Sequence, residues 1–367
     1  MKQLTIENLH CADTEDVFGD DECRLEVYHD GELHHAYRRD MDDGDDWPVD
    51  VSLLFVDTCS VRLFDEDGDF PGSDDDALGT VHIGPNEVDG ATATFTRDGA
   101  DYSLTYRVVD RPDLTVSDLA AFAIDEFERS TEPGVWPQID KGELIDQLRE
   151  RVRKPLKIRQ RKSQFCGPTS VVYELARTQP RRYVDLCRQV YETGGFWSRT
   201  HRIEAPTGLR TSRVGQRMTA ADWMLIATMR NEENLLFGTL PGSTGLISGL
   251  EGMTNHWEME GWTSEILLKD DVVNTTTFLW GEFDALHYAH QVWQAGGHAF
   301  LLIHTDLFDP PGGVVPPWPD HWVVYHGGLE EVGDRVRFDV YTWGRIEHVD
   351  TTLTHLEDCL DAVVTGV

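Results

Sequence analysis

The residues best suited to chemistry lie in the segment QRKSQFCGPTS, residues 160–170, where a cysteine stands at the expected start of a helix. Gly167 and Pro168 would occupy the first helical positions, where the missing N–H of proline costs nothing. A thiol at a helix N-terminus lies at the positive end of the helix dipole, which favours the thiolate. Gln160, six residues before Cys166, carries an amide that can donate to an oxyanion formed near the sulfur. The segment therefore predicts a nucleophilic cysteine with an oxyanion-stabilising partner.

A histidine that can serve as the base for this thiol comes far downstream. His321 opens the apolar run HWVVY, and the run RVRFDVYTWG, residues 335–344, supplies a second strand after a short turn. Alternation along a strand puts Asp339, Tyr341 and Trp343 on one face of that second run. We expect Asp339 to fix the tautomer of His321 and to stabilise its charged form, because a tyrosine is a poor partner for imidazolium.

These motifs resemble the papain-like cysteine peptidases. In that family a Gln, a Cys six residues later at a helix start, a His opening a strand and an Asn or Asp on the next strand occur in this order. The resemblance covers residues 160–344, with its motifs at the two ends. One departure is that Tyr341 stands where the family often carries the orienting Asn. The resemblance implies a helical lobe that carries Cys166, an antiparallel sheet that carries His321, and a protein or peptide substrate.

The resemblance also implies a mechanism. The thiolate of Cys166 would attack a carbonyl carbon, Gln160 and the Cys166 N–H would stabilise the oxyanion, and His321 would protonate the leaving group. Proteolysis is the expected reaction, although glutamine deamidation and acyl transfer use the same triad. The alternative is a catalytically degenerate papain fold that binds a partner as an adaptor, in which Cys166 packs as a small apolar residue.

The composition limits the partners. The chain has 367 residues, enough for two cores, and its 66 acidic and 32 basic residues give a formal net charge of −34. Such a surface repels nucleic-acid phosphates and anionic lipids, so neither a nucleic acid nor a membrane is an expected partner. The basic cluster from Arg149 to Lys162 is expected to neutralise acidic neighbours or to lead into the site, and nucleic-acid binding is the other reading of it. The sequence gives no indication of the oligomeric state.

The sequence contains no secretory signal pattern and no stretch of about 18 apolar residues, which favours a cytoplasmic protein. The six cysteines show no metal-type spacing and are expected to be reduced. By analogy alone, a sandwich module joined to a cysteine hydrolase would also suit an effector or toxin that a specialised secretion apparatus exports or injects.

The chain predicts an α+β protein with three parts. Residues 1–110 alternate short apolar runs with Asp- and Gly-rich turns, which indicates an antiparallel β-sandwich. Residues 111–158 contain two helical patterns and are expected to form a helical connector. Residues 159–367 show helices first and antiparallel strands later, and are expected to form the papain-like hydrolase domain.

Two acidic loops of the predicted sandwich, residues 13–22 and 63–79, resemble the calcium loops of C2 domains, a family of calcium- and lipid-binding sandwiches. Ca²⁺ takes about six to eight oxygen ligands, and a cluster of carboxylates supplies most of them. The chain is acidic throughout, so the same loops also fit a solvated surface. Membrane docking is not expected, because the loops lack basic and apolar tips. The positions that match the family's ligands are Asp16, Asp21, Asp65, Asp67 and Asp76.

Overall fold

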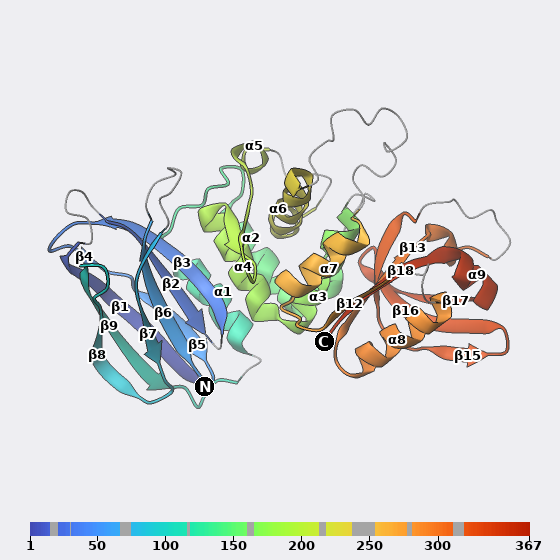
Figure 1. Cartoon of the computed structure of the whole chain (residues 1–367), viewed down its shortest axis with the longest axis horizontal. Coiled ribbons are helices and arrows are strands. Elements are labelled where there is room, and N and C mark those ends of the chain that lie inside the picture. Colours follow the sequence, from blue (N-terminus) through green and yellow to red (C-terminus); the bar gives the residue numbers. More distant parts are fainter. Residues whose placement is uncertain are drawn as a thin grey trace. The chain divides into compact units, whose positions relative to one another are not determined.

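This computed structural model describes residues 1–14, 21–29, 31–66, 75–115, 118–159, 165–212, 218–236, 254–276, 281–310 and 319–367. The protein is mixed α+β with several antiparallel sheets, and the chain divides into two compact units, Met1–Thr131 and Glu132–Val367 (Figure 1). This division falls inside the segment 111–158 that we expected to be a separate connector. None of the helices in the described ranges has the length and apolar character that crossing a bilayer requires.

The described residues of the first unit form antiparallel strands and helix α1 (Figure 1). Its elements are β1 (Lys2–Asp13), β2 (Asp21–His29), β3 (Glu32–Met41), β4 (Asp46–Trp47), β5 (Val51–Phe55), β6 (Cys59–Asp65), β7 (Asp76–Ile83), β8 (Val88–Phe95), β9 (Asp101–Asp110) and α1 (Leu119–Arg129). One antiparallel sheet has the order β4-β1-β9-β8 with β5 beside β1, and the other has the order β3-β2-β6-β7.

Alternation along the strands gives the first unit its core. Leu4 and Ile6 of β1 and Leu25 and Val27 of β2 are fully buried, and they belong to one apolar cluster although β1 and β2 lie in different sheets. Successive side chains of a strand point to opposite faces, so these residues, two apart in sequence, reach the same side. Because this cluster contains residues of both sheets, the two sheets share one core. Burial of each aliphatic side chain contributes about 1.5–3 kcal/mol to the stability of the folded unit.

The second unit combines helices with a larger antiparallel sheet (Figure 1). Its helices are α2 (Lys141–Arg153), η2 (Pro155–Lys157), α3 (Cys166–Thr178), α4 (Pro180–Thr193), α5 (Thr207–Arg210), α6 (Ala220–Leu236), α7 (His256–Glu265), α8 (Glu282–Gln294), η4 (Thr305–Phe308) and α9 (Leu353–Cys359). Its strands are β10 (Gly195–Trp197), β11 (Arg202–Glu204), β12 (Val272–Thr276), β13 (His298–Ile303), β14 (His321–Tyr325), β15 (Glu330–Val332), β16 (Arg335–Thr342), β17 (Arg345–Thr352) and β18 (Leu360–Gly366). The sheet order is β12-β18-β13-β14-β16-β15 with β17 beside β16, while β10 and β11 form a separate pair.

A buried ion pair joins two helices of the second unit. Arg151 of α2 donates from Nη2 to Oδ2 of Asp222 on α6 at 2.9 Å, and both side chains are almost fully buried. Arg151 is one of the residues in the basic cluster of the sequence, and Lys157 of the same cluster pairs with Glu150. These two cations therefore neutralise acidic neighbours, in keeping with the first reading of the cluster.

Replacing Asp222 by Ala should destabilise the second unit by about 3–5 kcal/mol, because the Arg151 charge would remain buried without its carboxylate. The free energy of unfolding in urea measures this loss. The control is Asp270→Ala, which removes a pair with Arg199 in which the Asp270 side chain is 86% exposed. That change should cost less than about 1 kcal/mol. Equal costs for the two variants would contradict the prediction.

Candidate active site

Helix α3, which begins at Cys166, packs lengthwise on the large sheet of the second unit. The Oγ of Ser170 lies 3.5 Å from the carbonyl oxygen of Trp322 on β14. One turn further on, the ring of Tyr173 stacks on Tyr341 of β16 at 3.5 Å with an interplanar angle of 6°. Residues three and four apart lie on one face of a helix, so α3 presents a continuous stripe to β14 and β16. This seating fixes the position of the first turn, where the candidate nucleophile lies.

The close approach at the start of α3 requires a glycine. A Cβ at Gly167 would lie 2.6 Å from Cβ of Thr254, which is too close for any larger residue without movement of the backbone. Thr254 in turn accepts a 2.7 Å hydrogen bond at its carbonyl oxygen from the indole N–H of Trp322. The CGP sequence is thus matched to its surroundings, which hold the first turn of α3 against β14.

The thiol of Cys166 is 1% exposed and lies among backbone amides. Burial raises the pKa of Cys166 to about 11, although the backbone N–H groups of Trp322, Gly167 and Cys166 itself act in the opposite direction. The helix N-terminus therefore favours the thiolate as expected, but desolvation outweighs it. At neutral pH the resting sulfur is a protonated thiol.

His321 is the first residue of β14, directly before Trp322. Its Nε2 lies 2.6 Å from Oγ1 of Thr342, and its ring stacks on Trp343 at 5.0 Å and 17°. Burial lowers the pKa of His321 to about 4, with the nearby charge of Asp320 acting in the opposite direction. The imidazole is therefore neutral at pH 7. Within the described ranges, Nδ1 of this ring makes no hydrogen bond.

The structure does not bring Asp339 to His321. Oδ1 of Asp339 lies 2.5 Å from Nδ1 of His348, and its backbone oxygen accepts a 2.8 Å hydrogen bond from the N–H of His326. In the antiparallel register Asp339 lies opposite His326, just past the end of β14 and far from His321. Thr342 lies beside His321, where we expected Asp339. The prediction considered only the face of the strand, whereas position along the strand decides which residue meets the imidazole. The signal was available, because the start of one antiparallel strand pairs with the end of the next.

Tyr341 has a structural role. Its hydroxyl donates to the carbonyl oxygen of Ile158, just after η2, while its ring stacks on Tyr173. The next residue but one, Trp343, has a φ of 50°, in the left-handed region that non-glycine residues rarely adopt. The tight turn at Trp343 and Gly344 lays the indole on His321. Backbone strain of this kind is a marker of functional sites.

Three of the predicted site residues, Gln160, Asp16 and Asp67, lie outside the described residues. The other predicted calcium ligands lie at one end of the sheet β3-β2-β6-β7. Asp65 pairs with Asp76 across β6 and β7, and it also pairs with Cys23, two residues after Asp21. Asp21 and Asp65 are buried, and Asp21 accepts a 2.6 Å hydrogen bond at Oδ2 from the hydroxyl of Tyr102.

A further acidic turn, which the sequence reasoning did not single out, lies near this end. Asp43 accepts hydrogen bonds at Oδ1 from the backbone N–H and the hydroxyl of Thr14, at 2.9 and 3.2 Å. Burial raises the pKa of Cys11, and the charges of Asp21, Asp43 and Asp45 raise it further. The charges of Asp21 at the end of the sheet and of Asp43 and Asp45 in the turn between β3 and β4 thus act on the same thiol. The two acidic segments therefore lie near each other. The signal in the sequence was the run DMDDGDDW, residues 40–47.

No family model matches this chain, and no curated protein matches it. Among solved structures, the chain is similar to a C2 domain, with 17% identity and a TM-score of 0.25, over 30% of this chain and 100% of that one. It is also similar to human GIVD cytosolic phospholipase A2 in complex with methyl gamma-linolenyl fluorophosphonate and terbium chloride. That match has 12% identity and a TM-score of 0.22, over 29% of this chain and 16% of the phospholipase chain.

The lowered pKa of His321 predicts a pH-dependent stability. The folded value is about 4, whereas an imidazole in an unfolded chain titrates near ~6.5, so protons bind preferentially to the unfolded chain between these values. The contribution of His321 to stability is therefore complete above pH ~6.5 and is lost as the pH falls to ~4, a change of about 3 kcal/mol.

The measurement is the free energy of unfolding in urea at a series of pH values for the wild type and for His321→Gln. The variant should lose less stability than the wild type between pH ~6.5 and ~4. The control is His348→Gln, since the His348 side chain is 81% exposed. Parallel pH profiles for the wild type and His321→Gln would refute the prediction.

Proposed function

We propose that the second unit is a cysteine hydrolase of the papain-like kind, with Cys166 as nucleophile and His321 as general base and acid. The observation that carries the proposal is the meeting of two chain segments. The thiol of Cys166, at the start of α3, contacts the backbone N–H of Trp322, the residue directly after His321 at the start of β14. Two segments more than 150 residues apart in sequence thus meet, and one carries the thiol while the other carries the imidazole.

The proposed reaction starts from a neutral thiol and a neutral imidazole. Nδ1 of His321 takes the thiol proton as the sulfur attacks the carbonyl carbon of an amide, and the carbonyl oxygen becomes an oxyanion. The N–H of Cys166 and the amide of Gln160 are the proposed oxyanion donors. The imidazolium then protonates the leaving amine, the C–N bond breaks, and a thioester remains. Water attacks the thioester while His321 takes its proton, and the acid leaves with the thiol restored.

Thr342 is proposed as the positioning residue for the imidazole. With its hydroxyl at Nε2, a proton on that nitrogen donates to Oγ1, and Nδ1 stays available for the thiol. A hydroxyl carries no charge, so it stabilises imidazolium less than a carboxylate does. The low pKa of His321 agrees with this, and it favours proton transfer during the attack over a preformed thiolate–imidazolium pair.

Hydrolysis of a peptide bond is the reaction we propose, with a protein or peptide as substrate. Deamidation of a glutamine side chain and acyl transfer to an amine use the same groups, and they differ only in the acyl donor and the acceptor. The alternative, a degenerate fold that binds a partner, draws support from the deep burial and raised pKa of Cys166. Thiol reactivity separates this alternative from the enzyme.

Iodoacetamide at pH ~7.5 should alkylate Cys166 at least about tenfold faster than Cys187 of α4, which is also buried, because the proposed base takes the proton from Cys166. His321→Ala should slow the reaction at Cys166 by about 10²-fold or more, because the base is lost. Peptide mass spectrometry follows both cysteines in one sample, so Cys187 reports any loosening of the fold. Thr342→Ala should give an intermediate rate and Thr342→Ser the wild-type rate. Equal rates at Cys166 in the wild type and His321→Ala would favour the degenerate fold.

We also propose that the first unit is a C2-like β-sandwich that binds Ca²⁺ at its acidic end. Support comes from Asp21, Asp65 and Asp76, which begin or end neighbouring strands at one end of the sheet. The turn that carries Asp43 and Asp45 adds to this acidic end. Carboxylate oxygens are the hard ligands that Ca²⁺ prefers, and several on adjoining loops form the multidentate cage that it needs. The ion would also relieve the repulsion among these acids.

Calorimetric titration of the full chain should detect Ca²⁺ binding that Asp65→Asn weakens at least about tenfold, because removal of one ligand charge lowers affinity. The matched control is Asp110→Asn, at the opposite end of β9, where the carboxylate pairs with Lys2. Calcium should also raise the melting temperature of the wild type and leave that of Asp65→Asn nearly unchanged. Binding that survives Asp65→Asn at full strength would exclude Asp65 as a ligand.

A further inference from the structure

An arginine on the outer face of the sheet β3-β2-β6-β7 lies next to the acidic end of the first unit. Arg24 of β2 pairs with Phe64 of β6 in the strand register, and its guanidinium lies over the Phe64 ring at 4.5 Å. Cys23, the residue before it, belongs to the core between the two sheets. Because consecutive side chains of a strand point to opposite faces, Arg24 points away from that core. It is nevertheless only 6% exposed, so its charge is largely removed from water.

Two carboxylates share the guanidinium of Arg24. Its Nη1 donates to Oε1 of Glu66 and to Oδ2 of Asp75, each at 2.6 Å. Arg38 of β3 donates to both carboxylate oxygens of Glu66, from Nε at 2.5 Å and from Nη2 at 2.9 Å. A bidentate pair of this kind fixes the orientation of a carboxylate as well as its distance. One buried cation therefore links two acids, and a second cation holds one of them in place.

These two acids are the immediate neighbours of two proposed calcium ligands. Glu66 follows Asp65 at the end of β6. Asp75 precedes Asp76 at the start of β7, and Asp76 pairs with Asp65 across the two strands. Because consecutive residues of a strand point to opposite faces, the carboxylates that Arg24 holds lie on the face opposite the ligands. Arg24 therefore acts on the chain directly behind the proposed site.

The strand pairing beside these ligands is interrupted. The register between β6 and β7 skips Leu78, which makes it the extra residue of a β-bulge. Within the described residues, two Cα pairs follow the bulge toward the acidic end, and the second is Asp65 with Asp76. A bulge disrupts the ladder locally, so these pairs gain little support from the strand pairing beyond it. The ion pairs of Arg24 hold the same two strand ends from the outer face.

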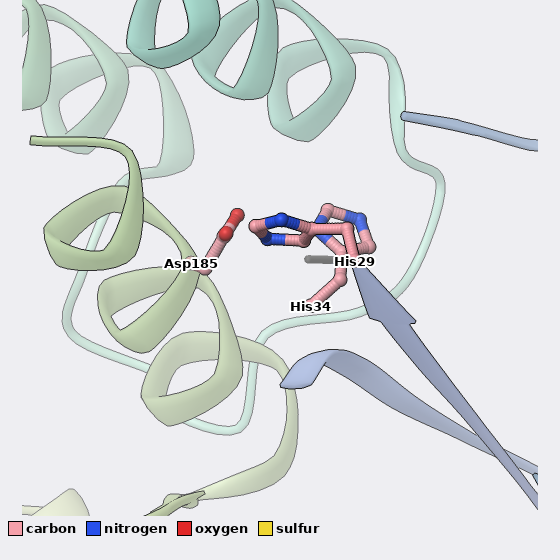
Figure 2. Close-up of side chains that lie close together, drawn as sticks. All are labelled: His29, His34 and Asp185. Carbon is pink, nitrogen blue, oxygen red and sulfur yellow. The ribbon is translucent and has the colours of Figure 1, made fainter. Parts of the chain in front are cut away.

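The opposite end of β2 is held by ring packing. His29, the last residue of β2, and His34 of β3 are buried, and their ring centroids lie 6.1 Å apart at an interplanar angle of 65° (Figure 2). Asp185, the third side chain labelled there, belongs to α4 of the second unit. The ion pairs of Arg24 and Arg38 are thus a feature of the acidic end.

We propose that Arg24 is a positioning residue for the calcium site. By holding the end of β6 and the start of β7 together, it sets Asp65 and Asp76 in place for the ion. The inference rests on the calcium binding proposed for the first unit. Residues that orient metal ligands from outside the coordination sphere typically change metal affinity about 10–100-fold, so the effect is large enough to measure.

Charge and position predict opposite effects when Arg24 is removed. A cation near Ca²⁺ repels the ion, and the freed carboxylates of Glu66 and Asp75 would attract it. Charge alone therefore predicts tighter calcium binding by Arg24→Gln. The positioning role predicts weaker binding, because Asp65 and Asp76 would lose their common support. The sign of the change thus separates the two effects.

The test is calorimetric titration of Ca²⁺ into the full chain at constant ionic strength. Arg24→Gln should weaken binding at least about tenfold relative to the wild type. The matched control is Arg62→Gln, which removes an arginine from the same face, where its guanidinium lies over the Tyr28 ring at 4.5 Å. This control should bind like the wild type. Equal or tighter binding by Arg24→Gln would overturn the positioning role, whereas absence of binding by the wild type would refute the calcium site and the positioning role together.

A second measurement needs no calcium and separates the positioning of the strand ends from a general loss of stability. The amide of Glu66 donates to the carbonyl oxygen of Glu22 at 3.1 Å. The amide of Arg111 donates to the carbonyl oxygen of Met1 at 2.9 Å and serves as the control. Arg24→Gln should speed hydrogen exchange at the Glu66 amide at least about fivefold and leave the Arg111 amide unchanged. Exchange that rises equally at both amides, or at neither, would overturn the proposal.

Asp75→Asn covers the case in which Arg24→Gln fails to fold. The Asp75 side chain is 41% exposed, so the fold should tolerate the change. The variant removes one of the two acids that Arg24 links, while Arg38 still holds Glu66. The Glu66 amide should then exchange at least about twofold faster than in the wild type. Unchanged exchange in this variant would overturn the proposal.

Discussion

The candidate site depends on the seating of α3 against β13, β14 and β16. Three layers of contact hold the helix, namely Gly167 against Thr254, Tyr173 against Tyr341, and Glu174 against His298. The last of these is a buried pair at 2.5 Å between Oε2 and Nδ1, and Arg177 also donates to the carboxylate. Burial raises the pKa of Glu174, but the hydrogen bonds from His298 and Arg177 outweigh it and hold the pKa below its usual value. The carboxylate of Glu174 therefore keeps its charge within the packed interface.

The same packing that positions the site also sets its resting chemistry. A thiol at a helix N-terminus should ionise easily, yet burial opposes the charged forms of both Cys166 and His321. The pKa of Cys166 is raised to about 11 and that of His321 is lowered to about 4, so both groups are neutral at rest. Charge would then develop only during reaction, where the N–H groups at the start of α3 stabilise it. A neutral Thr342 beside His321 suits this arrangement, because a carboxylate there would draw the imidazole toward its charged form.

Sequence reasoning identified the local features of this protein better than the contacts between distant segments. The CGP motif predicted that a helix starts at Cys166, and the HWVVY run predicted a strand that starts at His321, because capping and periodicity are local properties. The partner of His321 depends on the register between β14 and β16, which the alternation of side chains along one strand does not determine. For that reason we expected Asp339 beside His321, whereas the structure has Thr342 there.

The central claim is that the sulfur of Cys166 and the imidazole of His321 act on the same carbonyl group. A crystal structure of the full chain tests it most directly, through the distance from Sγ of Cys166 to Nδ1 of His321. The account predicts a separation of about 4 Å or less, the range in which a nucleophile and its base exchange a proton, with allowance for a resting enzyme. A thiol directed away from the ring, at more than ~7 Å and with Nδ1 bound to another protein group, would contradict the account.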